Sequence, residues 1–373
     1  MKITDVKAIP LYDGEILTRM DCLILIETDD GEVGVGEAYA HSPHGPDAAL
    51  AIQAIVETGY RPKLLGEDPT DYRRLWERCY RGYATAGLPV HALSGVDIAL
   101  MDLAGKALKV PAHKLLGGAF RDKVRVYASH MSIRPQMEVA LREAREAVEA
   151  GYTAIKVTAG LFPGFGLHPQ EDGKLLQQVR DVVDDDVELA LSFGPGNWVP
   201  GWGLSQARRF ARELERFDLL FWEEPLPRWD IDGYARLTAT VGLPIEAGEG
   251  LTDRLQVKDF LLRSGVDVVN TDIVEIGGLS EGKYVAEFAR RLGVRVIPHG
   301  LGTSVGAAAN LQLTASMPDG YLMEYRTSPP SPFMRELLTE PFKFEKGFIH
   351  VPNGPGLGIE LAEEGVRRYT YTR

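Results

Sequence analysis

Polar side chains recur along the second half of the chain where short apolar runs end. From Ser192 onward they are separated by roughly 25 to 30 residues, about one strand–helix unit. The residues are Lys156, Thr158, Ser192, Glu223, Glu249, Asp272, His299 and Glu324. Each alone is ordinary as a rim charge or a helix cap. Because the carboxyl ends of parallel strands meet at one face of a barrel, we expect these side chains to converge on a single polar site.

Several carboxylates together with a lysine and a histidine favour chemistry next to a carboxylate group. Carboxylates that share a cavity repel one another unless a cation neutralises them, and oxygen ligands select a hard ion, usually Mg²⁺. Such an ion stabilises the charge that develops when a base removes the neighbouring proton. Lys156 and the pair of His299 with Asp272 are the candidate proton-transfer groups.

The elements that must position this site follow two patterns. Residues 1–35 predict strands with an Asp-Gly hairpin at 29–32, and helical stretches follow near 46–60, 69–79 and 88–108. An α+β domain therefore ends near residue 120. Beyond it, helix-like segments separate eight apolar runs, which predict parallel strands closed into a barrel. The runs are Val124–His130, Thr153–Thr158, Val187–Ser192, Asp218–Glu223, Leu243–Glu249, Val266–Asp272, Val294–His299 and Tyr321–Tyr325.

Composition excludes several classes of protein. A net charge of −12 argues against nucleic acid or an anionic membrane as the main partner. Cys22 and Cys79 are too few for a disulfide framework or a thiolate metal site. The N-terminus lacks an apolar signal core, and no apolar run approaches the ~20 residues that span a bilayer. We therefore expect a cytoplasmic enzyme.

Motifs over nearly the whole chain resemble the mandelate racemase and muconate-lactonising branch of the enolase superfamily. They are Ser94–Leu100, Gly105-Lys106, Leu115–Gly118, Glu223–Pro225, Gly248-Glu249, Asp272 with Gly277-Gly278, Pro298-His299 and Pro355–Gly358. Each is weak alone, but their order and spacing are specific. The resemblance implies an α/β fold: an α+β capping domain (1–122), a modified TIM barrel of the (β/α)7β type (123–347), and a C-terminal segment (348–373) that returns to the capping domain.

The resemblance also implies one Mg²⁺ ion, with Glu223 and Glu249 as two of its ligands. The third ligand is normally an Asp on the third barrel strand, where this chain has Ser192. Because a serine hydroxyl is neutral, we expect weaker binding of the metal, or a further ligand from Asn197 or water.

The catalytic groups implied by the resemblance are a His299–Asp272 dyad, Glu324 at the substrate acid, and Lys156 as the first lysine of a Lys-x-Lys motif. Thr158 replaces the second lysine, so His299 is the best remaining base and two-base racemisation is not expected. Candidate substrate contacts are Thr158, His168, Trp198 and Arg326. Capping segments 12–20 and 40–46 would close over the barrel mouth.

Three functions stay open on these residues. One is a hydro-lyase acting on an acid sugar, in which His299 takes the α-proton and water is eliminated. Another is a racemase, epimerase or cycloisomerase that uses the same enolate. The third is a non-catalytic paralogue that only binds ligand, motivated by Ser192 and Thr158. In each case the partner is a small carboxylate, and the resemblance implies a homo-oligomer, a dimer or an octamer.

Two other motifs are weaker. Gly302–Gly306 fits the nucleophile elbow of hydrolases, with Ser304 as nucleophile, but only His350 follows it in the order that a hydrolase requires. Gly300–Gly302 lacks the third glycine of a dinucleotide fingerprint, although backbone amides here could bind an anionic group.

Overall fold

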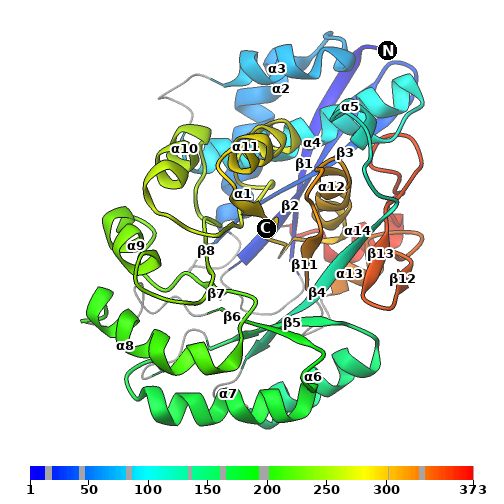
Figure 1. Ribbon diagram of the computed structural model, residues 1–373. Coiled ribbons are helices and arrows are strands. Elements are labelled where there is room, and N and C mark those ends of the chain that lie inside the picture. The colour runs from blue at the N-terminus through cyan, green and yellow to red at the C-terminus, as the bar shows by residue number, and fades with distance from the viewer. Residues whose placement is uncertain are drawn as a thin grey trace.

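An antiparallel meander and a set of helices form the N-terminal part of the computed structural model (Figure 1). The structure describes residues 1–12, 19–41, 47–80, 86–132, 137–159, 165–192, 201–300, 302–326 and 332–372. The meander is β1 (Ile3–Leu11), β2 (Arg19–Thr28) and β3 (Val33–His41), with the expected hairpin between β2 and β3. The helical elements are α1 (Asp47–Ala54), the π-helix η1 (Ile55–Tyr60), α2 (Arg61–Leu64), the 3₁₀ turn η2 (Pro69–Asp71), α3 (Tyr72–Cys79), α4 (Leu88–Leu108) and α5 (Ala112–Leu115).

Helix α4 is the central element of this domain and packs directly on β3. The two approach closely because glycines face each other: a Cβ added at Gly36 would lie 2.0 Å from the carbonyl oxygen of Gly95. By length and composition α4 is apolar enough to cross a membrane, but 89% of its most apolar window is buried inside the structure, as in a core helix. It thus carries its motif residues into the interface with the barrel.

Parallel strands alternate with helices through the rest of the chain, as predicted. In the described residues the strands are β4 (Lys123–Ser132), β5 (Ala154–Thr158), β6 (Glu188–Ser192), β7 (Trp222–Glu223), β8 (Ile245–Ala247), β9 (Val268–Val269), β10 (Arg295–Val296) and β11 (Leu322–Arg326). They pair in chain order from β4 to β10, and β11 returns to pair with β4. The helices between them are α6 (Met137–Glu149), α7 (Pro169–Val183), α8 (Leu204–Leu214) with the 3₁₀ turn η5 (Glu215–Phe217), α9 (Ile231–Thr238), α10 (Arg254–Arg263), α11 (Leu279–Arg291) and α12 (Ser304–Ala315).

Strands β8 to β10 end before the predicted runs do, because the chain leaves the extended conformation where it enters the site; Gly248 has φ of 129° directly after β8. Strand β7 ends at Glu223 as predicted but begins later, after Asp218 with φ of 48°. After β10, Pro298 has no N–H to donate to a ladder. The polar residues that follow β8, β9 and β10 therefore lie on loops at the barrel mouth.

An apolar layer fills the barrel beneath the mouth. It consists of Tyr127, Ala154, Ala190, Phe221, Val268, Ile297 and Leu322. Every barrel strand except β8 contributes one of these residues from the strand itself or from the residue beside it. Strand β8 instead carries Glu246, whose Cα pairs in register with Val268 on β9. This layer closes the core of the barrel beneath the mouth, and Glu246 is a charged residue at its level.

The C-terminal segment contacts both parts of the molecule. It contains α13 (Pro332–Glu336), β12 (Phe344–Glu345), β13 (Phe348–His350) and α14 (Glu363–Tyr369). Strand β13 pairs antiparallel with the start of β4, and Thr370 forms an isolated bridge with Leu11 of β1. The domain limits at residues 122 and 347 stay a prediction.

Candidate active site

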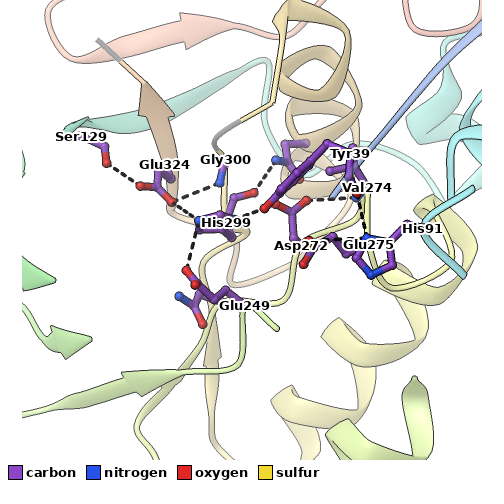
Figure 2. A network of polar contacts seen from close by, with 12 residues as sticks. Tyr39, His91, Ser129, Glu249, Asp272, Val274, Glu275, His299, Gly300 and Glu324 are labelled. Atoms are coloured by element: carbon purple, nitrogen blue, oxygen red, sulfur yellow. Dashed lines mark hydrogen bonds and ion pairs between the residues drawn. The ribbon is translucent and has the colours of Figure 1, made fainter. Parts of the chain in front are cut away.

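His299 lies at the centre of the polar residues above the barrel (Figure 2). Its Nδ1 lies 2.6 Å from Asp272 Oδ2. Its Nε2 lies 3.2 Å from Glu249 Oε2 and 3.8 Å from Glu324 Oε2. The two ring nitrogens therefore face different groups, with Asp272 on one side and the carboxylates of the mouth on the other. Sequence spacing placed these four residues together, and the structure brings them into contact range.

Lys156 joins the same group from β5. Its Nζ lies 2.9 Å from Glu223 Oε2 and 2.7 Å from Glu324 Oε1, and the side chain is buried. Burial alone would lower the pKa of this lysine, but the carboxylates of Glu223 and Glu324 raise it above its ordinary value. Lys156 is thus a fixed positive charge and not a base near neutral pH.

Charge sets the protonation of His299 and Glu324 as well. Burial opposes a charged imidazole, but Glu249, Glu324 and Asp272 together raise the pKa of His299 to about 10. The pKa of Glu324 is lowered despite its burial, because Lys156 and His299 both favour its charged form. Without a ligand, the site therefore holds a protonated His299 among carboxylates.

Ser192 ends strand β6, where the resemblance to the family predicted a third metal ligand. Its Cα pairs in register with Thr158 on β5 and with Glu223 on β7, and Glu223 in turn pairs with Glu246 on β8. Residues that share a register on neighbouring parallel strands face the same side of the sheet, so this row faces the barrel interior. Ser192 is partly buried within it.

The sequence prediction missed several polar residues of the site. Ser129 donates to Glu324 Oε1 at 2.5 Å, and Asn270 Nδ2 donates to Glu223 Oε1 at 2.6 Å. Arg228 lies 3.6 Å from Glu224 and 3.7 Å from Glu249. Burial, with repulsion from Glu249, raises the pKa of Glu224 to about 8. Glu246 is a charged residue between two apolar ones in Ile245-Glu246-Ala247. The sequence shows this pattern, but the prediction considered only the residues at which the predicted strands end.

The carboxylates of β7 and β8 match the donors that a hard cation prefers. Among the described residues, buried oxygens without a partner include Glu224 Oε1 and both oxygens of Glu246, whereas Glu223 Oε2 is paired with Lys156. Orphaned buried carboxylate oxygens call for a cation or a proton. Within the described residues, no group of three Asp, Glu, His or Cys side chains is arranged to hold a metal ion. Lys156 and Asn270 contact Glu223, and His299 contacts Glu249, so these carboxylates are engaged with other side chains. The donor set fits Mg²⁺ once these contacts rearrange.

The candidate substrate contacts are less well connected. Thr158 ends β5 beside Ser192, and Arg326 ends β11 two residues beyond Glu324. His168 is exposed at the N-terminus of α7. Trp198 and Asn197 lie outside the described residues. Of the loop aromatics, Trp202 is buried and donates to the carbonyl oxygen of Pro225, so it supports the core.

The glycine-rich turn after His299 belongs to the domain interface. Glu37 of β3 accepts hydrogen bonds from the backbone amides of Thr303 and Gly306 at 2.8 Å each. Ser304 is buried and donates to the carbonyl oxygen of Phe333 at 3.1 Å. The hydrolase interpretation is therefore wrong. Of the amides in Gly300–Gly302, that of Gly300 donates to Glu324 Oε2 at 3.1 Å, and Glu37 of the capping domain binds the amides that follow.

Two further capping-domain residues lie behind the His299–Asp272 pair. His91 Nδ1 donates to the carbonyl oxygen of Tyr39 at 2.7 Å and lies 3.6 Å from Glu275 Oε1. Glu275 is buried three residues after Asp272 (Figure 2). Asn310 of α12 donates to the carbonyl oxygen of His299 at 2.9 Å. Asp272 and Asn310 of the barrel thus hold His299 directly, and His91 of the capping domain lies near Glu275, three residues after Asp272.

Comparison with known proteins places the chain. Residues 16–117 match the mandelate racemase / muconate lactonizing enzyme N-terminal domain, and residues 139–365 match the enolase C-terminal domain-like family. A D-galactarolactone cycloisomerase of Agrobacterium fabrum is 33% identical over 94% of this chain and 91% of its own length. A D-xylonate dehydratase of Haloferax volcanii is 31% identical over 93% of this chain and 84% of its own length.

Solved structures agree with these matches. The crystal structure of the 3,6-anhydro-D-galactonate cycloisomerase from Zobellia galactanivorans has a TM-score of 0.88 and 29% identity, and the match covers 100% of both chains. The modified TIM barrel with an N-terminal capping domain, predicted from the sequence, is confirmed. Members of this superfamily generally use Mg²⁺. The chain is therefore an enzyme of the mandelate racemase and muconate lactonizing family within the enolase superfamily.

Proposed function

We propose that this enzyme is a Mg²⁺-dependent dehydratase of a hydroxylated sugar acid, acting in the cytoplasm as a homo-oligomer. The observation that carries the proposal is the His299–Asp272 pair at 2.6 Å, with the other imidazole nitrogen turned toward the carboxylates of the mouth. A positioned imidazole is the group that can take an α-proton near neutral pH. Dehydratases at 30 to 31% identity and nearly full coverage support the same reaction class.

Each residue of the site has its own role in the proposed reaction. Asp272 holds the Nδ1 proton of His299, so that the neutral imidazole presents Nε2 to the α-carbon of the substrate. Mg²⁺, when bound, supplies positive charge beside the substrate carboxylate, with Glu223 and Glu249 among its ligands. Lys156 adds a second positive charge, which offsets the carboxylate of Glu324 when the acid group of the substrate binds beside both. His299 takes the α-proton, and the electron pair left at the α-carbon forms the double bond to the β-carbon as the β-carbon–oxygen bond breaks. The protonated His299 then gives a proton to the departing hydroxyl, which leaves as water.

Metal binding by Glu249 would also switch the state of His299. The carboxylate of Glu249 is the chief group that raises the pKa of this imidazole. Once Glu249 is neutralised by a cation, this effect weakens and the neutral form becomes accessible. The base and one proposed ligand are therefore coupled through a separation of 3.2 Å.

Cycloisomerisation is a second candidate, because a D-galactarolactone cycloisomerase and a 3,6-anhydro-D-galactonate cycloisomerase are both close to this chain. The same proton removal from a cyclic substrate would open the ring without loss of water. Thr158 cannot act as a second base, so racemisation is not proposed.

The test is a panel of aldonic acids, aldaric acids, their lactones and anhydro acids, with Mg²⁺ and with EDTA, read by mass spectrometry. We expect a product lighter by one water that requires Mg²⁺. A product of unchanged mass from a cyclic substrate would replace dehydration by cycloisomerisation. No turnover of any member would favour the non-catalytic paralogue and overturn the proposal.

A further inference from the structure

Glu246 is a buried carboxyl group that neither the reaction nor the expected metal ligands account for. Its exposed fraction is 0%, and both of its oxygens lack a hydrogen-bond partner. On β9 its register partner is Val268 of the apolar layer, and on β7 the layer residue Phe221 lies two positions before the partner of Glu246. A carboxyl group in this setting is costly unless something binds it.

The register places Glu246 beside the metal ligands. Its Cα pairs with that of Glu223 on β7, and Glu223 pairs with Ser192 on β6. The three side chains thus form one inward-facing row, with a carboxylate at two positions and a hydroxyl at the third. Glu249, the other expected ligand, follows Glu246 on the same chain segment, after the turn at Gly248.

The neighbouring positive charge is already engaged elsewhere. The ion pairs of Lys156 run to Glu223 and Glu324, and Arg228 pairs with Glu224 and Glu249. Glu223 Oε2 is the oxygen that Lys156 contacts, so the oxygens without any partner here are those of Glu246. They face the barrel interior on the strand next to Glu223.

We propose that Glu246 is a ligand of the divalent cation and supplies the negative charge that Ser192 lacks. The site then has three carboxylates, from Glu223, Glu246 and Glu249, which is the donor chemistry that Mg²⁺ prefers. This inference depends on the proposed function only for the identity of the ion as Mg²⁺. The ligands themselves are inferred from the register of the barrel strands.

Binding of Mg²⁺ and Mn²⁺ to the full-length protein tests the proposal, by calorimetry and by the electron paramagnetic resonance of Mn²⁺. We expect one ion per chain, and Glu246→Gln should weaken its binding by at least about tenfold, since affinity follows the number of charged ligands. Ser192→Asp in the Glu246→Gln background should restore most of the lost affinity, because it returns the missing charge to the same row. Glu275→Gln is the matched control: it also neutralises a buried carboxyl near His299 and should leave the affinity unchanged.

Several outcomes overturn the inference. Wild-type affinity in Glu246→Gln, or no binding of either ion by the wild-type protein, would do so. An equal loss in Glu275→Gln would do so as well, because it would show a general effect of buried charge. Circular dichroism establishes that each variant is folded. Glu246→Asp provides a second variant, which keeps the negative charge but has a shorter side chain. The proposed function fails separately: metal binding that depends on Glu246 without turnover of any acid would refute the dehydratase and retain the ligand.

Discussion

At the scale of single residues, the site depends on how His299 is held. Asp272 holds one ring nitrogen and Asn310 holds the backbone carbonyl, so the first contact fixes the orientation of the ring and the second fixes the backbone that carries it. The other nitrogen is left to face Glu249 and Glu324. This arrangement assigns one task to each side of the ring: orientation on the Asp272 side, and proton transfer on the other.

His299→Asn should lower the turnover number at least about 100-fold, because general acid–base groups contribute about 10²- to 10⁴-fold. The measurement is steady-state turnover of the best acid from the panel. The affinity for Mg²⁺ provides the control, because His299 is not among the proposed ligands and its loss should leave the ion bound. Turnover near that of the wild type, in a folded variant, would remove His299 from the role of base.

The strand-end pattern was enough to find Lys156, Glu223, Asp272, His299 and Glu324, because parallel strands bring their carboxyl ends to one face. It could not find Ser129, Asn270 or Glu246. Their importance comes from which side chains they face on neighbouring strands, and that depends on a register between strands that the sequence does not specify. The role of each residue in catalysis remains a prediction.

At the scale of elements, carboxylates of the capping domain lie at the N-termini of two barrel helices. Glu37 binds the first turn of α12, and Asp97 of α4 accepts from the backbone amide and the hydroxyl of Ser280 at the start of α11. Unpaired amides and the helix dipole favour negative charge at this end of a helix. These contacts fix the loops that carry Asp272 and His299 against the capping domain.

Asp97→Asn should change how stability depends on pH. Burial raises the pKa of Asp97 to about 7 from an ordinary value of 3.8. The folded state therefore holds the proton more tightly than the unfolded chain. This contribution to stability is complete below about pH 4 and is lost as the pH rises to about 7, by at most about 4 kcal/mol. The measurement is the free energy of unfolding in urea between pH 5 and pH 8, in which the advantage of wild type over Asp97→Asn should shrink as the pH rises.

Trp76→Phe provides the control for this prediction. Trp76 donates to the carbonyl oxygen of Gly277 at 2.8 Å in the same interface, but it has no group that titrates in this range. Its effect on the free energy of unfolding should be constant with pH. A constant difference for Asp97→Asn as well would show that this carboxyl does not titrate between its two expected values.

The interface itself was beyond sequence reasoning. The strands, the hairpin and α4 were predictable from local periodicity and turn residues, whereas Glu37 and Thr303 are 266 residues apart and Asp97 and Ser280 are 183 apart. No local sequence pattern predicts a contact between residues so far apart in the chain. The capping segments 12–20 and 40–46, expected to close the mouth, lie largely outside the described residues.

At the scale of the whole molecule, acidic side chains are concentrated in the interior and at the mouth of the barrel. The chain has a net charge of −12, and its buried acidic groups include Glu223, Glu224, Glu246, Asp272, Glu275 and Glu324. Lys156, Arg228 and His299 are the cations beside them. The carboxyl groups exceed the cations, so folding brings together charges that repel unless protons or a metal ion balance them.

Mg²⁺ should therefore stabilise the whole fold and not only the mouth of the barrel. A ligand that binds only the folded state stabilises it by about 2.7 kcal/mol when its concentration is 100 times the dissociation constant. We expect the midpoint of thermal unfolding to rise by a few degrees with saturating Mg²⁺ and to return with EDTA, as followed by circular dichroism. NaCl at the same ionic strength is the control, because simple screening does not require the ligands; Glu249→Gln should reduce the shift. Equal midpoints in Mg²⁺, in EDTA and in NaCl would mean that the buried carboxyl groups are balanced by protons, and the acid-rich barrel would then have to be explained without a metal ion.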